Sequence, residues 1–103
     1  MQDIKKNIEK LNNMITEVTE CLYQYKEKQG FDQFELMFPL LTNISDTIAS
    51  IAQSEPNLSQ LMDQFNKSLI SILNSLESKD TVMVADILNF ELREIISNIS
   101  LAL

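Results

Sequence analysis

The stretch DIKKNIEKLNNMITEVTECLYQYKEK, residues 3–28, carries apolar side chains separated alternately by four and three residues. These positions are Ile4, Ile8, Leu11, Ile15, Val18, Leu22 and Tyr25. This spacing places them on one face of an α-helix, as in the seam of a helix that packs nearly parallel or antiparallel to its neighbours. The helix is predicted to end before Gly30, which can adopt the left-handed conformation common at helix C-termini.

The same alternation recurs in three further segments. The sequence predicts helices over residues 32–53, 57–77 and 81–101. In the first of these, the seam continues in phase across Pro39, which predicts one helix with a kink near the proline. The alternative is a short turn over 32–37, with Pro39 opening the main helix. In the third helix Leu61 and Leu73 widen the seam, and Asp80 is expected to cap the fourth.

The chain contains one glycine and two prolines in 103 residues, which favours helix because the turns of β proteins use both residue types. Four helices joined by short links predict an all-α fold, an antiparallel up-down-up-down four-helix bundle formed by a single domain over residues 1–103. Two alternatives are a three-helix core from which one helix peels away and a dimer that swaps a helix.

The charge balance is acidic, with fifteen Asp and Glu against eight Lys and Arg and a net charge of -7. Such a surface repels phosphate backbones, so no nucleic-acid partner is expected. The single cysteine, Cys21, cannot form an internal disulfide. No apolar run has the length of a membrane span or a signal-peptide core. A cytoplasmic protein with no membrane partner is therefore predicted.

Catalytic motifs are scarce. The chain has no histidine, and its one glycine cannot form a phosphate-binding loop. The pairs Glu17 and Glu20, and Glu91 and Glu94, resemble the Glu-x-x-Glu element of all-helical nucleotide pyrophosphatases, which implies Mg²⁺-dependent hydrolysis. The companion acidic motif of that family is missing, and most of these glutamates point away from the apolar stripes. We predict no enzymatic activity, no catalytic residue, no metal ligand and no cofactor.

A second apolar stripe distinguishes the fourth helix. Beside its main stripe, Met83, Ile87 and Phe90 follow four-three spacing of their own. One interpretation is that the fourth helix packs neighbours on two sides. The other, slightly favoured because small bundles place helices at corners, is that this stripe faces outward and binds a protein or a second copy of the chain.

A companion stretch, FDQFELMFPLL over residues 31–41, spreads its apolar side chains beyond one seam. In an up-down bundle the starts of the second and fourth helices lie at the same end, so Phe31, Leu36 and Phe38 are expected near the second stripe of the fourth helix. Asp86 and Arg93 would form its polar rim. Apolar aromatic and methionine side chains suit an adaptable binding surface, although the same residues could instead seal the end of the bundle.

These residues predict a non-enzymatic adaptor or chaperone-like module that binds a partner helix or self-associates, with a possible homodimer. The alternatives are the Mg²⁺-dependent hydrolase described above and a purely structural homo-oligomer. The segment VADILNFEL resembles an Ala-Asp-x-Leu-x-x-Glu-Leu pattern of small uncharacterised all-helical proteins of Gram-positive bacteria, a domain of unknown function. That resemblance implies a helical bacterial protein and no particular activity.

Overall fold

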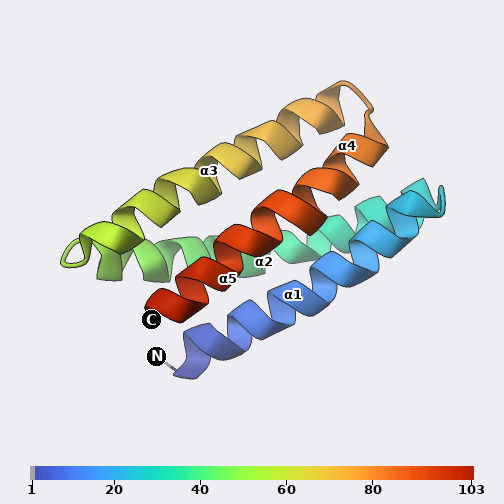
Figure 1. Cartoon of the computed structure of the whole chain (residues 1–103). Coiled ribbons are helices and arrows are strands. Elements are labelled where there is room, and N and C mark those ends of the chain that lie inside the picture. The colour runs from blue at the N-terminus through green and yellow to red at the C-terminus, as the bar shows by residue number, and fades with distance from the viewer. Residues whose placement is uncertain (1) are drawn as a thin grey trace.

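The fold is an antiparallel bundle of four helices (Figure 1). A computed structural model describes residues 2–103, with side chains from residue 4 onward, and this part of the chain contains no strand. The elements are α1 (Gln2–Tyr23), α2 (Glu27–Ala52), α3 (Pro56–Glu77), α4 (Thr81–Asp86), η1 (Ile87–Leu92) and α5 (Arg93–Ala102). The last three run on as one helix, called here the fourth helix. The predicted four-helix bundle is confirmed.

The helices follow one another around the bundle. α1 contacts α2 and the fourth helix, and α3 contacts the same two, so that α2 and the fourth helix lie diagonally opposite. The turns α1–α2 and α3–α4 lie at one end, while the α2–α3 turn lies at the other end with both chain termini (Figure 1). The seam side chains meet in the centre, where Leu11, Met37, Phe65 and Leu88 are fully buried.

The turn between α1 and α2 differs from the predicted one. α1 ends at Tyr23, and the residue with positive φ is Tyr25, at 61°. Tyr25 is also 79% exposed and does not belong to the seam. Gly30 lies buried within the first turn of α2, where an added Cβ would come within 2.7 Å of Leu22 Cδ2. The expectation that Gly30 ends a helix is wrong, because this glycine is needed where two helices approach closely.

Pro39 lies inside α2, which runs through it without interruption, as the in-phase seam predicts. The alternative in which Pro39 opens the helix is wrong. Proline lacks the amide that would bond to the carbonyl of Glu35, four residues earlier. Both residues are exposed, so water can solvate that carbonyl.

The fourth helix begins with a conventional cap and contains one unusual turn. The Asp80 carboxylate accepts a hydrogen bond of 3.0 Å from the Met83 amide, which confirms Asp80 as the N-cap. Residues 87–92 form a π-helical turn, which holds more residues per turn than an α-helix. Within it Ile87 and Leu88 are both buried. None of the helices described is long and apolar enough to cross a bilayer.

Candidate protein-binding site

The second stripe of the fourth helix is only partly at the surface. Phe90 is 66% exposed and Met83 is 46% exposed, but Ile87 is 8% exposed and belongs to the core. The expectation that Ile87 faces outward is wrong, because the fourth helix packs against both α1 and α3 around this residue, as the other interpretation held. Two separated apolar side chains therefore replace the continuous outward stripe.

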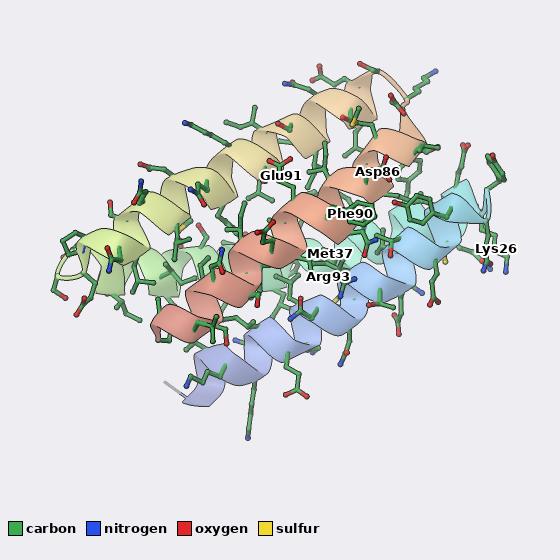
Figure 2. All side chains as sticks on the ribbon, viewed as in Figure 1. Lys26, Met37, Asp86, Phe90, Glu91 and Arg93 are labelled. Atoms are coloured by element: carbon green, nitrogen blue, oxygen red, sulfur yellow. The ribbon has the colours of Figure 1, made fainter. Side chains whose placement is uncertain are left out.

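Asp86 and Arg93, the expected polar rim on the fourth helix, form hydrogen bonds with α1 instead (Figure 2). The Tyr23 hydroxyl donates a hydrogen bond to Asp86 Oδ1, and Arg93 Nη2 donates one of 3.0 Å to Thr16 Oγ1. Partial burial, together with the hydrogen bond and the negative charge of Asp86, raises the pKa of Tyr23 to about 12. Asp86 and Arg93 thus hold α1 against the fourth helix.

The expected α2 residues point in different directions. Phe31 is half-buried and packs against the core. Leu36 is 68% exposed and lines a hollow between α1 and α2, beside Met14. Phe38 is 42% exposed and lies on the opposite side of α2, toward α3. Because α2 is diagonal to the fourth helix, these residues and Met83 do not form the single patch that the sequence suggested.

Phe38 instead belongs to an apolar groove between α2 and α3, called here the α2–α3 groove. The groove has a volume of about 190 Å³ and opens to solvent. Its floor is made by buried side chains, and its edges include two exposed large apolar side chains, Phe38 and Leu73, the latter 49% exposed. It is lined by Phe34, Phe38, Leu41, Thr42, Ser45, Asp46, Leu69, Ile72 and Leu73.

The edge residue Phe38 is held in place by a neighbour one turn earlier. The rings of Phe34 and Phe38 meet edge to face, with centroids 5.1 Å apart and an angle of 79° between their planes. Such a pair stabilises a defined ring orientation beyond the area that it buries. Because Phe34 is buried, it supports the ring of Phe38 in a defined position at the edge of the groove.

The α2–α3 side also lacks the polar cross-links found elsewhere in the bundle. Side-chain hydrogen bonds join the other neighbouring helices: Asn7 to Asn43, Tyr23 to Asp86, Arg93 to Thr16, and Ser68 to Glu91. Among the side chains of residues 4–103, no such bond joins α2 to α3. Among the described side chains, α2 and α3 are therefore joined by packing without a polar link.

Sequence reasoning found Phe38 but missed its partners on α3. Leu69 belongs to the four-three seam of α3, and Leu73, four residues later, broadens the apolar stripe beyond that seam. That broadening was the available signal, since Leu73 stood outside the four-three alternation. Ile70, also missed, is 57% exposed on the same helix.

The paired glutamates do not converge. Glu91 accepts a hydrogen bond of 2.8 Å from Ser68 on α3, and it lines a hollow with Glu94 and Lys67. Glu17 and Glu20 are exposed on α1, a different neighbour of the fourth helix. Over residues 4–103, no three or more acidic or cysteine side chains come together as a metal site would require.

Comparison with known proteins identifies the family. A family model described as a domain of unknown function (DUF8042) matches residues 1–101, and the chain belongs to this family. No curated protein and no solved structure matches the chain.

Proposed function

We propose that this member of the DUF8042 family is a non-enzymatic protein-interaction module, and that its α2–α3 groove takes the apolar face of a partner helix. The observation that carries the proposal is the groove itself, with buried apolar residues in its floor and Phe38 and Leu73 exposed at its edges. Helix-in-groove binding uses such a surface, in which one or two large side chains of the partner enter an apolar depression.

The size of the groove limits the size of the partner side chain that can enter it, called here the anchor. A cavity of about 150 Å³ lined by leucine, isoleucine and phenylalanine holds one benzene molecule. The α2–α3 groove, at about 190 Å³, therefore accommodates one phenylalanine or leucine side chain. A partner helix lying along it would place that anchor between Phe38 and Leu73 and would cover both.

The polar residues of the groove support the same function. Thr42 and Ser45 lie on α2 beside the apolar floor, where their hydroxyl groups can stay hydrated in the free protein. Binding surfaces commonly combine an apolar centre with a polar rim of this kind. The groove is thus suited to be open in the free chain and covered in a complex.

The test uses a designed amphipathic helical peptide with a leucine and phenylalanine stripe flanked by glutamine, so that it carries no charge next to the stripe. Fluorescence anisotropy of the labelled peptide would measure binding to the wild-type chain. We expect binding that is lost in Phe38→Ser/Leu73→Ser. The matched control is Met83→Ser/Phe90→Ser, which removes exposed apolar side chains from the fourth helix and should bind as the wild type does.

Circular dichroism would verify that both double variants stay folded, and sedimentation would follow the oligomeric state. Failure of wild type to bind this peptide and its charged relatives described below would overturn the proposal. Equal loss of binding in the two double variants would also overturn it, since binding would then not depend on the α2–α3 groove.

A further inference from the structure

We infer that the helix taken by the α2–α3 groove carries lysine or arginine on the flanks of its apolar stripe, an inference that rests on the proposed function. The volume and apolar lining of the groove do not distinguish one amphipathic helix from another. The charges around the groove discriminate among such helices, because complementary charge at an interface selects the partner and sets its orientation.

Carboxylates lie on both edges of the groove. Asp46 lines it from α2. Glu35 is exposed on the same helix, three residues before Phe38, a spacing that places the two side chains on one face. On α3 the exposed Glu77 follows Leu73 by four residues and continues the other edge. A helix seated between these edges would meet negative charge on each flank.

Basic residues are absent from most of this region of the sequence. Residues 29–66, which span most of α2 and the first half of α3, contain no lysine or arginine. The same segment contains five acidic residues: Asp32, Glu35, Asp46, Glu55 and Asp63. Lys67, the next basic residue, lines the hollow on the other side of α3 with Glu91 and Glu94. Lys28 precedes Glu35 by two turns, at the start of α2.

This charge distribution argues against a second copy of the chain as the occupant. Two copies that met groove to groove would bring Glu35, Asp46 and Glu77 of each against the same carboxylates of the other. Like charges placed together across an interface disfavour the complex. The net charge of -7 adds to that repulsion at long range.

Three designed peptides of about 18 residues, long enough to form a helix in water, test the inference. All share one leucine and phenylalanine stripe, and their flanking positions carry lysine, glutamine or glutamate. We expect the lysine peptide to bind about tenfold more tightly than the glutamine peptide, and the glutamate peptide to bind most weakly. The difference should shrink as salt is raised, because salt screens exposed charges.

A triple variant separates the groove carboxylates from the overall acidity of the chain. Glu35→Gln/Asp46→Asn/Glu77→Gln should remove most of the preference for the lysine peptide, measured as the ratio of the lysine-peptide to the glutamine-peptide affinity of the same variant. The matched control is Glu9→Gln/Glu17→Gln/Glu20→Gln, which removes the same charge from exposed positions on α1. This control should keep the preference.

The outcomes distinguish this inference from the proposed function. If the lysine and glutamine peptides bind equally and both need Phe38 and Leu73, the inference fails while the proposed function stands. If both triple variants lose the preference alike, the attraction belongs to the whole chain and the inference is also overturned. If none of the three peptides binds, the proposed function itself is overturned.

Discussion

α2 packs against α1 along one side and against α3 along the other, and the two contacts differ in how closely the helices approach and in whether a side-chain hydrogen bond joins them. On the α1 side, a Cβ added at Gly30 would come within 2.7 Å of Leu22 Cδ2, and Asn7 donates a hydrogen bond of 2.8 Å to Asn43. On the α3 side, Phe38 and Leu73 stay about half exposed.

The difference follows from the residues at each edge of α2. A filled helix interface needs large apolar side chains that interlock with those of the neighbour. Toward α3 the edge of α2 carries Thr42, Ser45 and Asp46, which are too small or too polar to fill the space. The close contact of Gly30 with Leu22, called here the closed side, and the α2–α3 groove, called here the open side, are thus specified by different residues of one helix, and each can be altered separately.

The largest effect expected is the contrast between two leucine-to-alanine substitutions. Leu22→Ala removes a fully buried side chain on the closed side and should lower the free energy of unfolding by about 2–5 kcal/mol. Leu73→Ala, at an edge of the groove, should lower it by less than about 1 kcal/mol, because half of that side chain already contacts water. Urea unfolding followed by circular dichroism measures both. Equal losses would show that the α2–α3 side is as closed as the other.

A smaller effect is expected for Gly30→Ala on the closed side. Alanine favours helix over glycine by about 1 kcal/mol. Against this, the new Cβ would lie 2.7 Å from Cδ2 of the fully buried Leu22, and overpacking of a filled site costs about 1–3 kcal/mol. We expect a net loss of about 1 kcal/mol in the free energy of unfolding, the difference of those two figures.

Introducing Gly30→Ala together with Leu22→Ala tests whether crowding against Leu22 causes the loss of stability. With the leucine shortened, the crowding disappears and only the helix preference remains, so Gly30→Ala should now stabilise the protein. The two substitutions would then be strongly non-additive, as neighbours that share one space are. A loss of the same size in both backgrounds would mean that the close approach at Gly30 does not determine the stability of this turn.

The closed parts of the bundle could be predicted from sequence because they follow helical periodicity. Nearly every position in the four-three seam of α1 is buried, from Ile4 to Leu22, as the spacing indicated. Spacing also gave the continuity of α2 through Pro39. Periodicity reports which face of a helix is apolar, and burial of that face is what makes a bundle.

The roles of Gly30 and Ile87 and the position of the α2–α3 groove depend on how neighbouring helices are placed, which helical periodicity does not predict. Gly30 resembled a helix end, but its role comes from how closely α1 and α2 approach. Ile87 is buried because the fourth helix packs against two neighbours, α1 and α3, which the spacing of its residues alone left open. The α2–α3 groove likewise depends on the separation of two helices, so Phe38 was identified and Leu69 was not.

Filling the open side should have a smaller and opposite effect. Thr42→Leu would place a larger apolar side chain in the α2–α3 groove, and filling such a space typically adds about 0.5–2 kcal/mol to the free energy of unfolding. We expect the free energy of unfolding to rise by about 0.5 kcal/mol, the lower end of that range, because the groove is open to water. The same variant should bind the designed peptides less tightly. A gain in stability with unchanged binding would separate the groove from the binding site.

The last effect, which appears only at alkaline pH, is expected where α1 is linked to the fourth helix, at Tyr23 and Asp86. In a Tyr25→Phe variant Tyr23 is the only tyrosine, and its ionisation can be followed by the absorbance of tyrosinate. The pKa should be about 12, above the ordinary value of 10.0, because of partial burial, the hydrogen bond to Asp86 and the charge of that carboxylate. Circular dichroism on the same samples shows whether the chain is still folded.

The sign of the linked stability follows from the direction of that shift. The folded chain holds the tyrosine proton more tightly than the unfolded chain, so the contribution is complete below pH 10.0 and is lost as the pH rises toward about 12. Tyr23→Phe should remove this part of the pH dependence. Asp86→Asn should lower the pKa of Tyr23 only in part, because partial burial is the larger cause and remains. A pKa near 10.0 in the folded Tyr25→Phe chain would contradict the link between α1 and the fourth helix.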